Sequence, residues 1–137
     1  MYQEELVLPM RAELTDEGFT ELKTPQQVTD LFKNNKGSLL IIVNSVCGCS
    51  AKSARPAVIE SLEREKKPHA LATVFAGVDA DATAEARKYM LPYPPSSPSI
   101  ALFKDGKLVH FVERHQIEGN PPNLIAENLM WAYDQYC

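Results

Sequence analysis

The chain of 137 residues has a hydrophobic fraction of 45%, a charged fraction of 23% and a formal net charge of −4. These values are typical of a soluble protein with its own hydrophobic core, and we expect one domain over residues 1–137. The acidic balance argues against nucleic acid as the main partner, because phosphate contacts need clustered Lys and Arg.

The first residues, Met1 to Glu5, are acidic, whereas a secretory signal begins with basic residues. No apolar run approaches the ~20 residues that span a bilayer. We therefore expect a cytoplasmic protein that does not associate with a membrane. Three cysteines in a reducing compartment do not suggest a framework of structural disulfides; they indicate catalysis, metal binding or no chemical role.

The N-terminal part of the chain predicts two helices and a short strand. Apolar residues recur at helical spacing in an N-terminal helical extension, residues 1–18. Residues 19–22 alternate between apolar and polar, which is typical of a short edge strand. The segment 24–27, Thr-Pro-Gln-Gln, predicts a helix start, because its threonine and last glutamine can form a capping box around a proline at the first helical position.

A continuous apolar run at residues 39–44 predicts a central strand that is covered on both faces. Cys47-Gly48-Cys49 follows it, where a helix is expected to begin. A helix N-terminus presents free N–H groups and a partial positive charge, and both favour a thiolate over a thiol. Because the thiolate is the nucleophilic form, this placement indicates thiol–disulfide chemistry.

The helix after the motif contains Pro56, so we expect it to bend near residues 52–56. Its last turns are expected to be the charged residues before Pro68, which stops it. Residues 71–76 predict a second buried strand. A helix joins this strand to the first one, so the two strands should be parallel.

Asp79 or Asp81 can cap the next helix, and the proline-rich segment 92–98 excludes regular structure. Asp105-Gly106 predicts a two-residue hairpin turn between strands 99–104 and 107–113. A last helix is expected to open at the proline pair that follows. The predicted fold class is α/β, a sandwich of three layers with a central mixed sheet.

This arrangement resembles the thioredoxin fold. The resemblance rests on the strand, the cysteine motif at the head of a bent helix, the βαβ unit and Ser97-Pro98 before a hairpin strand. In that superfamily a cis proline precedes the third core strand and faces the cysteine motif, and Pro98 matches that position. The one-residue spacing of the cysteines departs from the Cys-x-x-Cys of thioredoxin.

The chain is more similar to the bacilliredoxin family, thioredoxin-like proteins of bacteria. The segments that carry this similarity cover nearly the whole chain: residues 8–14, 43–49, 54–57, 74–77, 96–99 and 110–119. The resemblance implies that Cys47 attacks the disulfide of a protein capped with bacillithiol, a low-molecular-weight thiol, and takes the cap. Cys49 then resolves the mixed disulfide. Bacillithiol is thus the implied co-substrate, no cofactor is tightly bound, and the partners are capped or disulfide-bonded proteins.

Gly48 and Pro98 complete the expected centre of the site. Gly48 lets the backbone turn between the cysteines. A disulfide across one residue closes a smaller ring than one across two, so we expect strain and an oxidising couple, suited to isomerase or weak reductase activity. A cis bond at Pro98 would leave the Ser97 carbonyl free to pair with a substrate backbone.

Arg55, Asn44 and Ser45 are further candidates for substrate or thiolate contacts. Arg55 can support the thiolate or bind a carboxylate of the thiol cap, and a solvated helix position fits it equally well. Asn44 and Ser45 can hydrogen-bond a thiolate or cap the following helix. A counterpart of thioredoxin's buried acidic residue is not evident in the motif strand.

Two other functions stay open at this stage. A metal carrier would add His110 and His115 to the cysteine pair as ligands, although structural roles for both histidines are favoured. A thiol peroxidase would need a cysteine activated towards peroxide. Cys137, the last residue, is interpreted as a terminal thiol, and a third redox role for it stays open.

Overall fold

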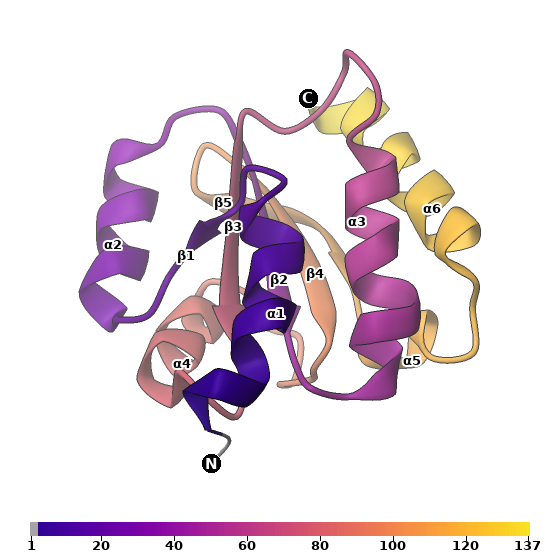
Figure 1. Ribbon diagram of the computed structural model, residues 1–137. Helices are drawn as coiled ribbons and strands as arrows, with labels where there is room; N and C mark the ends of the chain where they lie inside the picture. Colours follow the sequence, from indigo (N-terminus) through magenta and orange to yellow (C-terminus); the bar gives the residue numbers. More distant parts are fainter. Residues whose placement is uncertain (1–2) are drawn as a thin grey trace.

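The computed structural model describes residues 3–137 as a five-stranded sheet with helices on both faces (Figure 1). The elements are α1 (Glu4–Thr15), β1 (Thr20–Glu21), α2 (Pro25–Asn34), β2 (Ser38–Asn44), the π-helical turn η1 (Ser50–Ala54), α3 (Arg55–Ser61), β3 (Ala70–Phe75), α4 (Ala80–Lys88), β4 (Ser99–Lys104), β5 (Lys107–Val112), α5 (Arg114–Ile117) and α6 (Pro122–Tyr136). The predicted α/β fold class is confirmed. None of the helices within residues 3–137 is both long and apolar enough to cross a membrane.

The sheet is built around β2, whose residues are all buried. The strand order is β1-β3-β2-β4-β5. β3 pairs with β2 in parallel and β4 pairs with it antiparallel, so the sheet is mixed, as expected. The edge strand predicted at residues 19–22 is β1, which pairs in parallel with β3.

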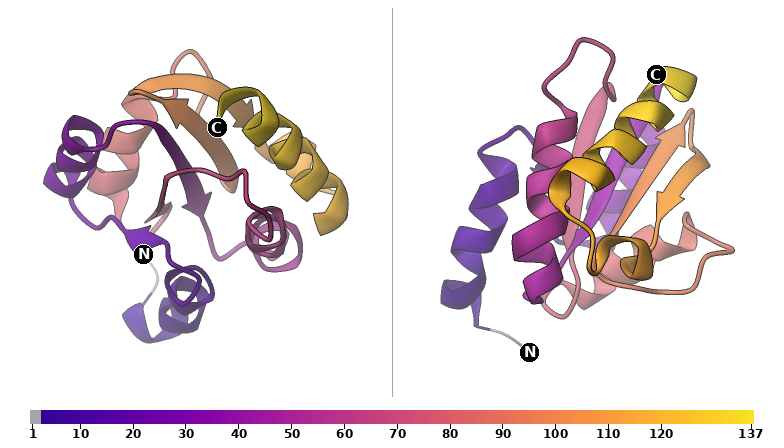
Figure 2. Two further views of the ribbon diagram at one scale, coloured as in Figure 1. Left: turned by 90° about the horizontal axis from the view of Figure 1, so that it is seen from above. Right: turned by 90° about the vertical axis from the view of Figure 1, so that its right-hand side faces the viewer.

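Successive residues of β2 pack alternately into two separate hydrophobic cores, because neighbouring side chains of a strand point to opposite faces. Leu40 and Ile42 pack in the core below α3 and α6. Leu39, Ile41 and Val43 pack in the core below α2 and α4. Figure 2 shows these two helix pairs on opposite sides of the sheet. The apolar run therefore forms the middle layer of the predicted sandwich.

Local sequence signals place two of the element boundaries. The Thr24 hydroxyl accepts a hydrogen bond from the Gln27 N–H, and the Gln27 side chain accepts one from the Thr24 N–H, which is the predicted capping box at α2. Asp105 and Gly106 have φ values of 49° and 83°, as a type I′ hairpin turn requires. Both predictions are confirmed.

The helix after the cysteine motif differs from expectation at its end. The predicted bend is the π-helical turn η1, in which the Arg55 N–H donates to the Ser50 carbonyl, directly before Pro56. The prediction that the helix continues to Pro68 is wrong, since α3 ends at Ser61. The N–H groups that follow bond three residues back, which tightens the last turn and ends the helix. Beyond this turn, Arg64 and Lys66 donate hydrogen bonds to Met130 and Asp134 of α6 instead of continuing the helix.

Arg11 ties the N-terminal helix to the rest of the domain. Its buried guanidinium lies 3.0 Å from a Glu4 carboxylate oxygen, 2.9 Å from Glu21 and 2.8 Å from Asp79. It also lies 5.3 Å from the centre of the Phe75 ring, a cation–π contact. One cation thus holds three carboxylates that come from α1, β1 and the start of α4.

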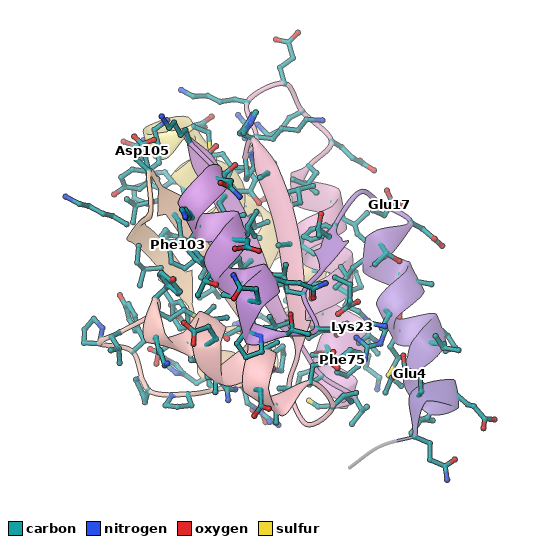
Figure 3. The ribbon with its side chains drawn as sticks, turned by 90° about the vertical axis from the view of Figure 1, so that its left-hand side faces the viewer. Glu4, Glu17, Lys23, Phe75, Phe103 and Asp105 are labelled. Atoms are coloured by element: carbon teal, nitrogen blue, oxygen red, sulfur yellow. The ribbon has the colours of Figure 1, made fainter. Side chains whose placement is uncertain are left out.

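The Arg11 cluster changes the expected capping of α4. Asp79 occupies the N-cap position but makes no side-chain cap hydrogen bond, because its carboxylate is bound by Arg11. At the outer side of the cluster, Lys23 lies 4.0 Å from Glu4, and Figure 3 shows these two side chains close together, near Phe75. Burial raises the pKa of Glu21 to about 7, although Arg11 opposes the shift.

Glu21 predicts a specific dependence of stability on pH. A carboxyl whose pKa is higher in the folded chain stabilises the fold at low pH, and this contribution is lost as pH rises from about 4.5 towards 7. We expect Glu21→Gln to gain stability relative to the unmodified chain between pH 5 and 8, by on the order of 2 kcal/mol. Urea unfolding across this range measures it. Glu65→Gln, at an exposed carboxylate, is the control; equal pH slopes for the unmodified chain and Glu21→Gln would contradict the prediction.

Candidate functional site

The cysteine motif lies between the end of the central strand and the start of a helix. β2 ends at Asn44, and helical backbone begins at Gly48. The Cys47 carbonyl accepts hydrogen bonds from the N–H groups of Ser50 at 3.0 Å and Ala51 at 3.4 Å, so Cys47 is the N-cap residue. The Cys49 N–H donates to Cys47 Sγ over 3.2 Å. The sulfur therefore takes the role that a serine or threonine oxygen has at other helix starts.

The two thiols have opposite pKa shifts. Burial opposes ionisation of Cys47, but hydrogen bonds from the Cys49 N–H and thiol, the Ser50 N–H and the charge of Arg114 together lower its pKa below the usual value. The hydrogen bond that the Cys49 thiol donates to Cys47 raises the pKa of Cys49, and burial and the Cys47 charge act in the same direction. Cys47 is thus the first thiol to ionise, as expected for a nucleophile.

Arg114 brings a positive charge to the motif from a distant part of the chain. It is the first residue of α5, its Nη1 donates to the Ser97 carbonyl over 3.1 Å, and its Nε lies 3.2 Å from a carboxylate oxygen of Glu118. These two contacts fix an otherwise exposed side chain, 44% of which is accessible. Arg114 is therefore held beside the thiolate by Ser97 and Glu118, which are both distant from the cysteines in sequence.

Arg55 and Asn44 form a buried support below the motif and not a substrate contact. Arg55 is 2% exposed and Asn44 is fully buried. Arg55 Nη1 donates to Asn44 Oδ1 over 2.8 Å and to the Ser45 carbonyl over 3.0 Å, and its Nε lies 2.9 Å from a Glu13 carboxylate oxygen. The expectation that Arg55 binds a carboxylate of the thiol cap is wrong, because helix α1 covers it.

Asn44 neither bonds the thiolate nor caps the helix. Its Oδ1 also accepts from the Ser45 N–H at 2.9 Å, and its Nδ2 donates to the Met10 carbonyl over 3.3 Å. Ser45 lies closer to the site: its hydroxyl accepts from the Cys47 N–H over 3.4 Å and lies 2.9 Å from the Ser50 hydroxyl. These bonds set the path of the loop from β2 to the cysteines.

The Ser97–Pro98 bond is cis, as expected from the resemblance, and so is the Leu91–Pro92 bond, which was not predicted. Pro98 is buried directly before β4, whose Ser99 pairs with Val43 near the end of β2. The Ser97 carbonyl is not free, contrary to expectation, because it accepts the hydrogen bond from Arg114. A substrate backbone must share this oxygen with Arg114 or displace it.

Gly48 lies beside the two cysteines and has open space where a side chain would be. Its φ is not in the left-handed region, and a Cβ at this position would meet no atom within 4 Å. In this dithiol state, neither the backbone conformation nor a close contact requires glycine there. Glycine leaves this part of the surface beside Cys47 without a side chain, and we expect that to ease the approach of a bulky disulfide.

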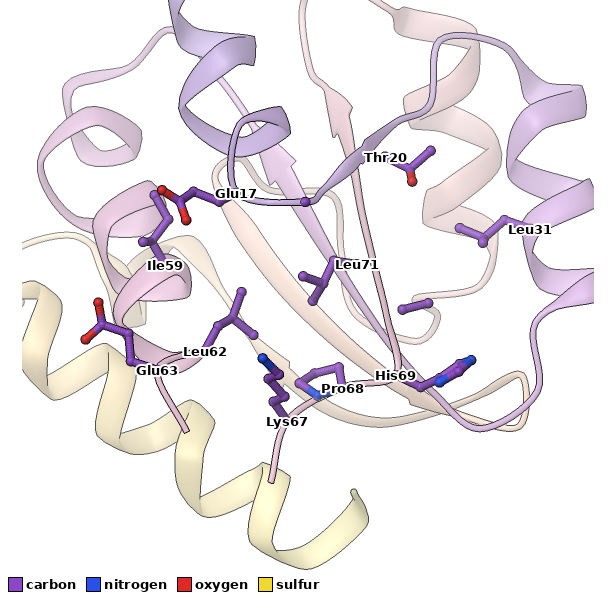
Figure 4. Close-up of a pocket in the computed structure, with 12 residues that line it drawn as sticks. Glu17, Thr20, Leu31, Ile59, Leu62, Glu63, Lys67, Pro68, His69 and Leu71 are labelled. Carbon is purple, nitrogen blue, oxygen red and sulfur yellow. The ribbon is translucent and has the colours of Figure 1, made fainter. Parts of the chain in front are cut away.

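A groove of about 830 Å³ runs alongside the cysteines. It is lined by residues of the motif, η1 and the connection from α5 to α6: Cys47, Gly48, Cys49, Lys52, Ser53, Arg114, Gly119, Asn120, Pro121 and Pro122. Another hollow, of about 490 Å³, lies at the start of β3 and contains neither cysteine (Figure 4). Its floor includes Leu62 and Leu71, which Figure 4 shows facing the same space. The groove beside the cysteines is therefore the candidate substrate site.

The remaining thiol and the two histidines lie outside this groove. His110 Nε2 lies 2.7 Å from Asn128 Oδ1 and its ring packs on Trp131. Within residues 3–137, no group of three or more His, Cys, Asp and Glu side chains is placed to hold a metal ion, so the structure does not join His110 and His115 to the cysteines as ligands. Cys137 packs at the edge of the core between α3 and α6.

Sequence reasoning missed Arg114, Glu118 and Lys52 as parts of the site. A signal for α5 was present, since Glu113 and Gln116 form a capping box around its first turn. That pattern predicts a helix start directly after β5, although it does not say where the helix lies. Only the position of β5 in the sheet brings Arg114 to Cys47.

Solved thioredoxins share this fold. The structure aligns with the thioredoxin of Fasciola hepatica at a TM-score of 0.60 and 21% identity, covering 87% of this chain and 100% of that chain. A mutant thioredoxin from Halobacterium salinarum aligns at a TM-score of 0.57 and 17% identity, covering 82% and 88%. Both alignments show that the chain has the thioredoxin fold.

Comparison with related sequences gives the family. Residues 2–137 match the protein family described as Disulphide isomerase. A bacilliredoxin of Cytophaga hutchinsonii is 58% identical over 135 residues, 98% of this chain and 99% of that protein. A bacilliredoxin of Halalkalibacterium halodurans is 49% identical over 136 residues, 99% of this chain and 94% of that protein. The chain belongs to the bacilliredoxin family, as the sequence motifs predicted.

The pKa shifts predict the order in which the two thiols react. At pH 7 we expect iodoacetamide to alkylate Cys47 before Cys49, because the pKa of Cys47 is lowered and that of Cys49 is raised. Arg114→Gln should move the titration midpoint of Cys47 to higher pH, since it removes a stabilising charge. Peptide mass spectrometry of alkylation against pH gives the midpoints. Arg64→Gln removes an equal charge elsewhere; a midpoint unchanged by Arg114→Gln would contradict the prediction.

The Gly48→Ala variant tests whether the glycine is needed for folding or for access of a disulfide to the Cys47 sulfur. The variant should fold with unchanged or slightly higher stability, by up to about 1 kcal/mol, because alanine restricts the unfolded chain and meets no clash in the folded one. Reaction of Cys47 with a bulky protein disulfide should slow, while its reaction with a small disulfide changes less. Thermal unfolding and exchange rates measure the two effects. Equal slowing of large and small disulfides would contradict a role in clearance.

Proposed function

We propose that this chain removes bacillithiol from S-bacillithiolated proteins, with Cys47 as nucleophile and Cys49 as resolving thiol. The observation that carries the proposal is the partly exposed Cys47 thiol at a helix start, whose pKa is lowered and whose sulfur accepts a hydrogen bond from the N–H of the second cysteine, Cys49. The relatives named bacilliredoxins, at 49% and 58% identity, support bacillithiol as the cap. We place the activity in the cytoplasm, where thiols are kept reduced.

The reaction has two thiol–disulfide exchange steps. The Cys47 thiolate attacks the cap sulfur of the protein disulfide; the S–S bond to the protein breaks, and the protein thiolate leaves and takes a proton. Cys49 then loses its proton and attacks the Cys47 sulfur, which releases bacillithiol and leaves a disulfide between Cys47 and Cys49. The protein disulfide has been reduced and the cysteine pair oxidised. Two electrons from further low-molecular-weight thiol return the pair to the dithiol.

The site favours the dithiol form of the couple. Hydrogen bonds and the Arg114 charge stabilise the Cys47 thiolate, which exists only in the reduced protein. Stabilising the reduced form makes the disulfide more oxidising. An oxidising couple releases its substrate readily and can rearrange wrong disulfides, so we include weak disulfide isomerase or reductase activity in the proposal. The family description Disulphide isomerase supports this part.

A capped target protein tests the proposal directly. Cys47→Ser should abolish removal of the cap, because no other thiol of the motif has a lowered pKa. Cys49→Ser should accumulate a mixed disulfide between Cys47 and bacillithiol, visible by mass spectrometry, since the resolving thiol is missing. Cys137→Ser should behave as the unmodified chain. Retained activity in Cys47→Ser would disprove the nucleophile, and equal rates with a glutathione cap would disprove the cap specificity.

A further inference from the structure

The groove beside the cysteines carries positive charge and no acidic lining residue. Its charged lining side chains are Lys52 and Arg114. The nearest carboxylate in the hydrogen-bond network is Glu118, which is bound to Arg114 Nε and does not line the groove. Arg114 Nη2 has no hydrogen-bond partner within residues 3–137. The groove therefore presents solvent-exposed cationic donors that a ligand can bind, although the charge of Glu118 also acts on Cys49 and offsets part of the Arg114 charge.

Lys52 has no structural role that would explain its place in the groove. Its side chain is exposed, and it forms no ion pair with any residue of the described chain, 3–137. It follows Cys49 by three residues and belongs to the π-helical turn η1. Both residues line the groove. Lys52 is thus an ammonium group without an ion-pair partner in residues 3–137, in the same groove as the thiol that resolves the mixed disulfide.

The opposite wall of the groove is held in place. The Ser53 hydroxyl donates to the Asn120 carbonyl over 3.0 Å, and Asn120 Nδ2 donates to the Gln116 carbonyl over 2.6 Å. Pro121 and Pro122 follow, and proline restricts the backbone further. A ligand that enters the groove therefore meets a formed surface, so little conformational entropy is lost on binding.

We infer that this groove binds the carboxylate-bearing part of the small thiol cap, with Lys52 and Arg114 as its specificity-determining cations. The inference rests on the proposed function and names the chemistry of its substrate: a low-molecular-weight thiol with one or more carboxylates. An anionic cap is repelled by the Cys47 thiolate that attacks it. Two cations beside the sulfur offset this repulsion during the approach.

The exchange step itself is unchanged by the groove. The Cys47 thiolate bonds to the cap sulfur, the original S–S bond breaks, and the leaving thiolate takes a proton from solvent. The cap stays on Cys47 with its carboxylates beside Lys52 and Arg114. When Cys49 attacks, the cap leaves as a thiolate, and the same cations stabilise its charge. Arg114 also lowers the pKa of Cys47, so Lys52 is the better residue for a test of charge selectivity.

Three symmetrical disulfides that differ mainly in charge provide the test: 2-hydroxyethyl disulfide, the disulfide of 3-mercaptopropionate, and cystamine. In a Cys49→Ser background, mass spectrometry follows mixed-disulfide formation at Cys47. We expect Lys52→Gln to slow the carboxylate disulfide about two- to fivefold relative to the neutral one, the range of an exposed ion pair, and to favour cystamine. The effect should fade in 1 M salt, because screening shortens the range of the charges to about 3 Å.

Lys36→Gln is the matched control, since Lys36 is exposed and precedes β2 at the end opposite the cysteines. It should leave all three rate ratios unchanged. If Lys52→Gln slows all three disulfides equally, or discriminates among protein targets but not among small disulfides, the inference is overturned. Reaction of Cys47 with the neutral disulfide needs no contact between a cap carboxylate and Lys52 or Arg114. Loss of that reaction in the otherwise unmodified chain would instead overturn the proposed function.

Discussion

The hydrogen bond from the Cys49 N–H to Cys47 Sγ organises the chemistry of this protein. It forms only because the helix begins at the motif, and that start is set by β2, which is buried along its full length and ends at Asn44. Arg55 reaches back from α3 to Asn44 and Ser45 and fixes the loop between strand and helix. A buried cation thus positions the nucleophile without touching the substrate.

The one-residue spacing gives the two cysteines different roles within one helical turn. Cys47 is the N-cap residue of the helix, and its sulfur accepts hydrogen bonds. Cys49 lies in the first turn of the helix and donates them. The proton therefore stays on Cys49 while Cys47 ionises, so no separate base is needed to make Cys47 the nucleophile. Arg114 adds charge from α5 while its contact with Ser97 links that charge to the cis-proline loop. The active centre joins three segments that are distant in sequence.

Local sequence patterns predicted those features whose energetics are local. The hairpin at Asp105-Gly106 follows from backbone sterics, and the capping box at Thr24 from hydrogen bonds between near neighbours. Local patterns did not predict which charged side chains are buried. Arg55 lies in a helix where many arginines face water, and only the packing of α1 over α3 buries it. The prediction for the end of α3 was also wrong. The charged residues after Ser61 favour helix intrinsically, but here Arg64 and Lys66 bond to α6 from a non-helical segment.

By itself, the sequence determined the central strand, the place of the cysteines at its end and the family, since apolar periodicity and short motifs are properties of neighbouring residues. The tertiary structure alone decided that the charge of Arg114 lies beside the sulfur. Arg114 and Lys52 meet at one groove because the sheet order places β4 beside β2 and β5 beside β4, so α5 is carried to the motif. Electrostatics depends on distance in space, and a sequence pattern fixes distance only along the chain.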